Sequence, residues 1–428
     1  MSPSFAHEII WLVAAMAIFA IIARPWGLPE AVWAVAGAAV LVLGSLVSWS
    51  QARAAVLEGV DVYLFLAGMM VLAELARTEG LFDWVAALAI RWARGSPSRL
   101  FGLVYLVGIV VTALLSNDAT AVVLTPAVYA AATKARTDPL PYLLICAFIA
   151  NAASFLLPIS NPANLVVFAS HLPPLPAWLA DFLTPSLMAI VATYFVLRAT
   201  QRRALRESFT STVQMPPLTR GAQLAALGIL VTVVVLLWAS AVGLELGMPT
   251  FLAGGVTTAL VLVIDRHTPW PIVKGVSWGV IPLVAGLFVL VAGLGRTGLL
   301  AALADGMRQL TLHSGHTAAL AAGVSTAAAS NVMNNLPVAL IAGSIGTGAR
   351  VSSQLKDAML IGVARDDLVA DRAPAGKSAV EWPDIPQVGG AGDAARIAAL
   401  AGGGGVTAPA LSVISAPQSR PSAADQLP

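Results

Sequence analysis

A short polar stretch, Ser116-Asn117-Asp118-Ala119-Thr120, interrupts an apolar run that resumes at Ala121. Its two hydroxyl groups, one amide and one carboxyl group can exchange hydrogen bonds with a small, oxygen-rich solute. Facing lipid without partners, these groups would be costly. We therefore expect a helix break here, with the polar side chains directed at a cavity, a neighbouring helix or a bound solute.

A second polar stretch runs from Pro158 to Asn164 and holds Ser160, Asn161 and Pro162. Its two prolines remove backbone donors and prevent a continuous helix. The amides of Asn161 and Asn164 can satisfy the freed carbonyl groups or reach into a site. We expect a helix to restart after Asn164, with an N-terminal dipole that favours an oxygen-rich or anionic solute.

A third polar stretch begins at Ser330-Asn331 and is followed by Pro337, as Ser116-Asn117 is followed by Pro126. Two further pairs of stretches correspond in the same order: residues 66–72 with 284–290, and 77–81 with 296–299. Three ordered matches favour a duplicated transmembrane unit. Such duplications place a transporter's substrate site on broken helices between the repeats. Interhelical hydrogen bonding is the alternative for a single Ser-Asn pair.

Asp118 is the candidate titrating group, because an ionisable residue at membrane depth is costly unless it is paired or functional. Its carboxyl group can take up and release a proton in each transport cycle. The alternative is a permanently hydrogen-bonded carboxylate that caps the half-helix behind it. Glu74 lies near the end of its apolar window, where we expect a boundary residue paired with Arg77.

The elements that must position these residues follow from composition. Charged residues make up 11% of the 428-residue chain and hydrophobic residues 58%, whereas about a quarter of a soluble domain is charged. We predict an all-α polytopic membrane protein with roughly ten membrane elements, some of them re-entrant. The apolar windows are 9–23, 31–47, 62–75, 100–115, 140–157, 182–197, 224–242, 251–264, 281–294 and 317–329.

Basic residues are concentrated between Arg198 and Arg220, and a smaller cluster holds Arg91, Arg94 and Arg99. The positive-inside rule places both clusters in the cytoplasm. We expect them to contact lipid headgroups rather than a nucleic acid, since no basic soluble domain accompanies them.

We expect no cofactor and no metal centre. A single cysteine, Cys146, permits no internal disulfide and no multi-cysteine site. No phosphate-binding loop motif occurs, so energy must come from an ion gradient or from a separate ATPase subunit. We expect the histidines at positions 171, 267, 313 and 316 to lie in loops, without the spacing of a metal site.

The residues 116–126, 160–165 and 331–337 resemble the arsenical-pump membrane proteins, the ArsB-type arsenite exporters of the wider ion-transporter superfamily. The resemblance runs from about residue 10 to Val363 and is more specific for the superfamily than for the substrate. It implies two inverted repeats, each with a re-entrant hairpin and an unwound helix. It also implies export of arsenite or antimonite across the cell (inner) membrane, by proton exchange or with a cytoplasmic ATPase subunit, and no enzymatic activity.

This resemblance implies a midplane site between the repeats, with Asp118 as its proton-coupling group. Arsenite is an uncharged trihydroxide at neutral pH, which a ring of hydroxyl and amide groups can bind. The expected substrate-binding residues are Ser116, Asn117, Asp118, Thr120, Ser160, Asn161, Asn164, Ser330, Asn331, Asn334 and Asn335.

The chain departs from the family pattern after Val363, where the second repeat should supply its own unwound helix. We expect a first repeat over 1–197, a basic loop over 198–223, an incomplete second repeat over 224–363 and a disordered tail over 364–428. We hypothesise that this tail is a frame-shifted reading of the last span. A nucleotide sequence with no open membrane-spanning frame across codons 364–386 would remove that hypothesis.

Three alternatives remain at this point. A sodium/proton antiporter or dicarboxylate carrier belongs to the same superfamily, although a carboxylate at Asp118 would repel a dicarboxylate. An intramembrane enzyme would need a second catalytic group beside Asp118. The third alternative is an inactive, truncated product.

Overall fold

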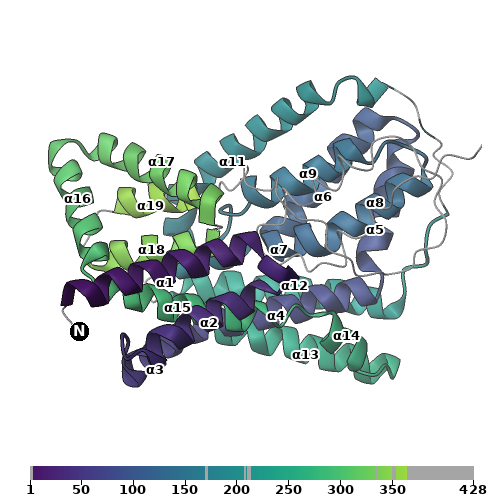
Figure 1. Ribbon diagram of the computed structural model, residues 1–428. Helices are drawn as coiled ribbons and strands as arrows, with labels where there is room; N and C mark the ends of the chain where they lie inside the picture. The colour runs from purple at the N-terminus through teal and green to yellow at the C-terminus, as the bar shows by residue number, and fades with distance from the viewer. Residues whose placement is uncertain are drawn as a thin grey trace, which may run out of the picture.

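The computed structural model describes residues 3–168, 172–206, 209, 214–333, 335–348 and 353–363, and every regular element in these ranges is helical (Figure 1). The all-α class predicted from composition is confirmed. The first-half helices are α1 (Pro3–Ala23), α2 (Glu30–Leu43), α3 (Trp49–Glu58), α4 (Val60–Thr78), α5 (Leu81–Ala93), α6 (Pro97–Leu114), α7 (Asn117–Ala119), α8 (Thr125–Lys134), α9 (Leu140–Ala152), α10 (Pro162–Phe168) and α11 (Leu175–Thr200).

The second half continues the same pattern of long and short helices. Its helices are α12 (Arg220–Ala241), α13 (Gly247–Asp265), α14 (Trp270–Gly275), α15 (Val280–Arg296), α16 (Leu299–His313), α17 (Gly315–Met333), α18 (Asn335–Gly348) and α19 (Ser353–Val363). Residues 364–428, to which we assigned a disordered and frame-shifted tail, lie outside the described residues.

Among the described residues, five helices are long and apolar enough to cross a membrane: α1, α6, α11, α12 and α13. Two bent pairs, α3 with α4 at 46° and α15 with α16 at 73°, raise that number to seven if each pair is one span. The windows in α2 and α9 are helices of only 14 and 13 residues, short of the ~20 that a straight crossing needs. The ten predicted elements are therefore not ten full spans.

Large apolar side chains are exposed along the outer faces of the long helices, which indicates surfaces that face lipid. On α12, for example, Leu227, Leu230 and Val234 are each more than half exposed. The opposite face of the same helix buries Ala225, Ile229 and Leu236.

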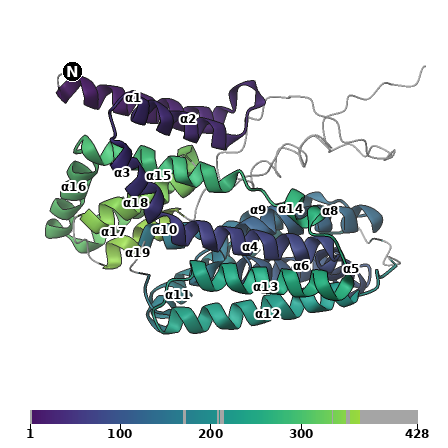
Figure 2. The same cartoon turned by 90° about the horizontal axis from the view of Figure 1, so that it is seen from below.

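The helices of the two halves pack in corresponding pairs. In Figure 2, α4 of the first half lies beside α13 and α12 of the second, while α15 of the second half lies near α2 and α1 of the first. Within each half, α5 contacts α6 as α16 contacts α17, and α6 contacts α9 as α17 contacts α19. The bent helix of each half, α4 or α15, therefore packs mainly against helices of the other half.

Two glycines allow the bent helices to approach the other half closely. A Cβ atom at Gly68 of α4 would lie 2.5 Å from the carbonyl oxygen of Thr250 in α13. A Cβ atom at Gly286 of α15 would lie 2.7 Å from the carbonyl carbon of Ala34 in α2. These glycines occupy equivalent positions in the matched stretches 66–72 and 284–290, so the sequence correspondence has a counterpart in packing.

The two basic clusters lie at one end of the molecule. The backbone amide of Phe209 donates to the carbonyl of Gly95 at 3.3 Å, which joins the loop after α11 to the end of α5. At the same end, the Thr219 hydroxyl donates to the carbonyl of Glu79. The helices extend into the predicted loop 198–223, because α11 continues to Thr200 and α12 begins at Arg220.

The expectation that the histidines lie in loops is wrong for two of them. His313 ends α16 and His316 lies in the first turn of α17. His267 lies in the connection between α13 and α14, and His171 lies outside the described residues.

Candidate functional site

The first break follows α6. Ser116 has an extended backbone, with φ 168° and ψ 167°, and its hydroxyl accepts from the amide of Ala119 at 3.2 Å. This is an N-cap arrangement, which satisfies a donor that the first turn of a helix leaves free. The chain then forms a π-helical segment over residues 120–124 before α8. Asn117 and Asp118 are thus presented at the start of an irregular helix.

Hydrogen bonds inside the protein fix this break. The hydroxyls of Thr112 and Thr120 lie 2.8 Å apart, and the Thr125 hydroxyl donates to the carbonyl of Thr120. Thr120 is fully buried. Its hydroxyl therefore connects α6 to the π-helical segment and does not line the cavity described below.

The second break lies between α9 and α10 and is closed by Asn164. Its amide nitrogen donates to the carbonyls of Ser154, Leu157 and Pro158, at 2.9, 3.2 and 3.3 Å. The helix restarts at Pro162, before Asn164 and not after it, because the Asn161 side chain accepts from the amide of Ala163 and caps it. Asn164 thus holds the loop, while Asn161 faces the cavity.

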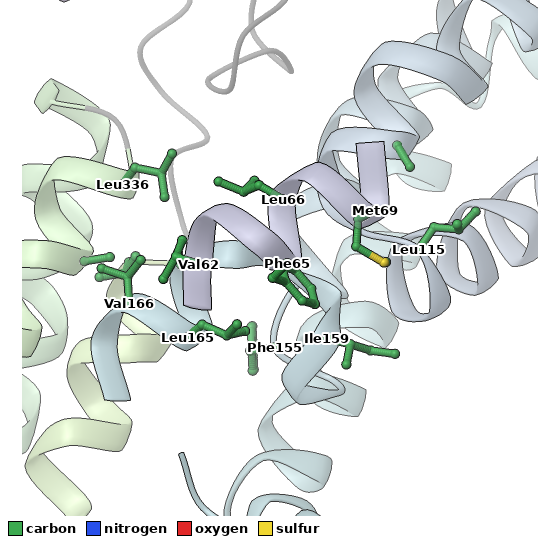
Figure 3. Packing of buried hydrophobic residues seen from close by; sticks show 14 of the residues in the cluster. Val62, Phe65, Leu66, Met69, Leu115, Phe155, Ile159, Leu165, Val166 and Leu336 are labelled. Atoms are coloured by element: carbon green, nitrogen blue, oxygen red, sulfur yellow. The ribbon is translucent and has the colours of Figure 1, made fainter. Parts of the chain in front are cut away.

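Ser160 joins the two breaks. Its hydroxyl donates to the carbonyl of Ala113 near the end of α6 and accepts from the amide of Leu157. Both breaks pack on α4, whose side chains Val62, Phe65 and Leu66 meet residues of the first break, α10 and α18 in one buried cluster (Figure 3). Hydrogen bonds and side-chain packing thus connect the two broken segments to each other and to α4.

The third stretch differs from its expected form. Ser330 and Asn331 lie inside the continuous helix α17, where the Asn331 side chain donates to the carbonyl of Ala327 in the same helix. The next helix starts at Asn335, and Asn334 lies outside the described residues. No proline lies within α17, so the helix continues through Ser330.

A cavity lies where these segments meet α4 and the connection between α14 and α15. Its volume is about 70 Å³, whereas one water molecule needs about 10–15 Å³. It therefore has room for a small solute or for several water molecules. Its walls are mostly apolar, and the polar residues that line it are Glu74, Ser116, Asn117, Asp118, Asn161, Ser277 and Asn335.

The structure thus brings together five of the eleven expected binding residues: Ser116, Asn117, Asp118, Asn161 and Asn335. Five others do not line the cavity: Thr120, Ser160, Asn164, Ser330 and Asn331. The hydroxyl of Ser330, in α17, is buried without a hydrogen-bond partner.

The chemistry of the lining is that of a hydrogen-bond acceptor site. The Oδ1 atom of Asn117 is buried and has no hydrogen-bond partner, which leaves an acceptor that a solute hydroxyl can satisfy. The carboxyl groups of Asp118 and Glu74 add acceptors when ionised. Among the described residues that line the cavity, none is lysine, arginine or histidine. A polyanion would find no counter-charge there.

Sequence reasoning missed Glu74 and Ser277. Glu74 shares one face of α4 with Leu66 and Met70, at helical spacings of four and eight residues, and that face lines the cavity. This spacing is readable from the sequence. Ser277 follows α14 in an irregular connection, and no local pattern marks it.

Comparisons with known proteins agree with this architecture. The model of the citrate transporter family matches residues 5–364. An arsenical pump membrane protein of Yersinia enterocolitica is 28% identical over 68% of this chain and 70% of its own length. The arsenical pump membrane protein of Escherichia coli K12 is 27% identical over the same shares. An uncharacterized transporter of Mycobacterium tuberculosis is 27% identical over 65% of each chain.

Proposed function

The chain belongs to the citrate transporter family and is a multi-pass membrane transporter, and we propose that it exports arsenite, and with it antimonite, in exchange for protons. The main observation in support of this substrate is the lining of the cavity. It offers carboxyl, amide and hydroxyl groups and, among its described residues, no basic side chain.

An uncharged trihydroxide fits such a lining. Its hydroxyl groups can donate to the unpartnered Oδ1 of Asn117 and to an ionised carboxylate of Asp118, and its own oxygens can accept from amide groups. The similarity to arsenical pump membrane proteins of two enterobacteria supports the same substrate class.

Citrate is disfavoured by the same lining. A tricarboxylate that enters a partly apolar cavity needs cationic partners, because burying an unpaired charge is expensive. Two carboxyl groups, those of Glu74 and Asp118, line this cavity instead. The family match supports the transport class, and the lining favours an uncharged solute over citrate.

Competition between the proton and the solute for the Asp118 carboxylate would couple arsenite export to proton entry. The ionised carboxylate accepts charge-assisted hydrogen bonds from solute hydroxyls, and the protonated form loses much of that attraction. A proton that arrives from outside therefore favours release of the solute. Each cycle would exchange one bound solute for one bound proton at this residue.

Arsenite uptake into everted membrane vesicles tests the proposal. Wild-type vesicles energised to an acidic interior should accumulate arsenite, and citrate in excess should not compete. The Asp118→Asn variant keeps a hydrogen-bonding side chain but cannot exchange a proton. It should lose gradient-driven accumulation to background. Because the charge-assisted hydrogen bond is also lost, the exchange that remains at zero gradient should need more arsenite and should no longer depend on pH.

Vesicles with wild-type protein that accumulate no more arsenite than vesicles without it would overturn the exporter assignment. Gradient-driven uptake that persists in the Asp118→Asn variant would overturn the coupling role of Asp118. The folded amount of each variant in the membrane serves as the control for expression.

A further inference from the structure

Glu74 is a second acidic residue in the cavity wall, and its partner reaches the surface. The residue is 5% exposed. The Arg77 guanidinium donates to both of its carboxylate oxygens, at 2.8 Å to Oε2 and 2.5 Å to Oε1. The side chain of Arg77 is half exposed, whereas that of Glu74 is 7% exposed. The pair therefore reaches from the cavity wall to the exterior.

The position of Glu74 along α4 shows at which end of the cavity the pair lies. Leu66, Met69, Met70, Ala73 and Glu74 line the cavity, and Glu74 is the last of them. It lies about 7.5 Å along the helix axis before Glu79, which contacts the loop that carries the basic cluster. That end of the molecule is the cytoplasmic end by the positive-inside rule.

A neighbouring glycine leaves room for the Glu74 carboxylate. A Cβ atom at Gly275, where α14 ends, would lie 1.7 Å from its Oε1 atom. The following residues, Val276 and Ser277, line the same cavity. The carboxylate thus lies at the boundary between the cavity and the α14–α15 connection.

The second half of the chain has no equivalent carboxyl group. Position 74 lies between the matched stretches and falls opposite Ala292 or Gly293, neither of which is acidic, while Arg77 corresponds to Arg296. Arg296 donates instead to the carbonyl of Leu46 and to the side chain of Gln51. The ion pair of Glu74 with Arg77 therefore occurs in one half only. This is expected of a feature that acts on one side of the membrane.

We propose that Glu74 carries protons between Asp118 and the cytoplasmic end of the cavity, with Arg77 as the counter-ion that stabilises its ionised form. This inference rests on the proposed proton exchange. In each cycle, protonated Asp118 gives its proton, through the cavity, to the Glu74 carboxylate. Glu74 then releases the same proton to cytoplasmic water and returns to its ion pair with Arg77. One proton moves and no other bond changes.

Charged groups on α5 and on the other elements packed against α4 enter any pH dependence. Asp83 of α5 acts on Arg77 electrostatically. The elements packed against α4 carry the titratable or charged side chains Lys274 of α14, Asp265 of α13, Arg220 of α12, Arg296 of α15 and Arg53 and Glu58 of α3. Asp118 lines the same cavity as Glu74.

Two transport modes in everted vesicles separate the role of Glu74 from that of Asp118. Glu74→Gln should slow gradient-driven arsenite accumulation at least tenfold, because the proton loses its route to the cytoplasmic end. Arsenite exchange at zero gradient should fall less than accumulation, because Gln keeps an acceptor in the cavity. Its pH dependence should remain that of the wild type, because competition at Asp118 persists. Glu74→Asp, which keeps a carboxyl group, should restore much of the accumulation.

Glu79→Gln is the matched control. Glu79 is also a buried carboxylate near the end of α4, at 9% exposure, and it pairs with His267. It does not line the cavity. This variant should accumulate arsenite as the wild type does.

Accumulation by Glu74→Gln equal to that of the wild type would overturn the assignment. Loss of both accumulation and exchange, with Glu74→Asp equally inactive, would assign the pair a structural role and overturn it too. If the wild type itself moves no arsenite, the proposed function fails, an outcome that is distinct from either result.

Discussion

Two asparagines in the broken segments have the same side chain but different roles. The amide nitrogen of Asn164 donates to three carbonyls of the second break. Asn117 lines the cavity with a buried, unpartnered Oδ1 atom. Burial alone does not separate them, since both are less than 9% exposed. The Oδ1 atom of Asn164 is also buried without a hydrogen-bond partner. What separates the two residues is the cavity, which Asn117 lines and Asn164 does not.

Alanine at each position should therefore change different quantities. Asn117→Ala removes a hydrogen bond to solute and should raise the KM for arsenite about tenfold, without loss of folded protein. Asn164→Ala removes the side-chain donor to the carbonyls of Ser154 and Pro158 and should cost about 1–3 kcal/mol of stability. Transport kinetics and thermal unfolding in detergent measure the two effects. A wild-type KM in Asn117→Ala would contradict its assignment to the site.

At the scale of elements, close helix contacts depend on small residues at defined places. The α4–α13 contact has Gly68 on one side, and a Cβ atom at Gly254 on the other would lie 2.6 Å from the carbonyl oxygen of Gly68. Without a hydrophobic drive inside lipid, such close packing is a main source of helix association. Because α4 also forms one wall of the cavity, this contact holds the cavity in shape.

Gly68→Ala should force α4 away from α13. The added methyl group would clash with backbone atoms that cannot rotate aside, at a cost of about 1–3 kcal/mol. Gly255→Ala is the control. Gly255 lies in α13, beside Gly254, and a Cβ atom there would meet no atom within 4 Å. Thermal unfolding of the purified proteins measures both. Equal melting temperatures for the two variants would contradict this account of the contact.

At the scale of the whole molecule, we predict that the end with the two basic clusters faces the cytoplasm. The contact between Phe209 and Gly95 joins them, and α12 runs away from that end for 22 residues. At 1.5 Å per residue this is about 33 Å, enough to cross a hydrocarbon core of about 30 Å. Glu245, in the connection after α12, therefore lies on the opposite face.

Cysteine labelling tests that orientation. A membrane-impermeant maleimide should label Arg202→Cys in inside-out vesicles only and Glu245→Cys in right-side-out vesicles only. The native Cys146 is fully buried, so it should give no background. Labelling of both variants from the same side would contradict the assignment of the basic end to the cytoplasm.

The sequence by itself determined the helical membrane class, the positions of the first two breaks and the pairing of Glu74 with Arg77. These features depend on local causes: apolar composition, prolines at 158 and 162, and side chains three residues apart on one helix. The sequence also identified Asp118 and Asn117, because polar groups inside an apolar run need a partner or a cavity.

Only the tertiary structure decided which polar groups share a cavity. It brought Glu74 and Ser277 to Asp118, directed Thr120 and Asn164 into hydrogen bonds within the fold, and kept Ser330 inside α17. The physical reason is that a polar side chain reaches a partner or a cavity according to how distant helices pack. Sequence spacing along one helix does not contain that information.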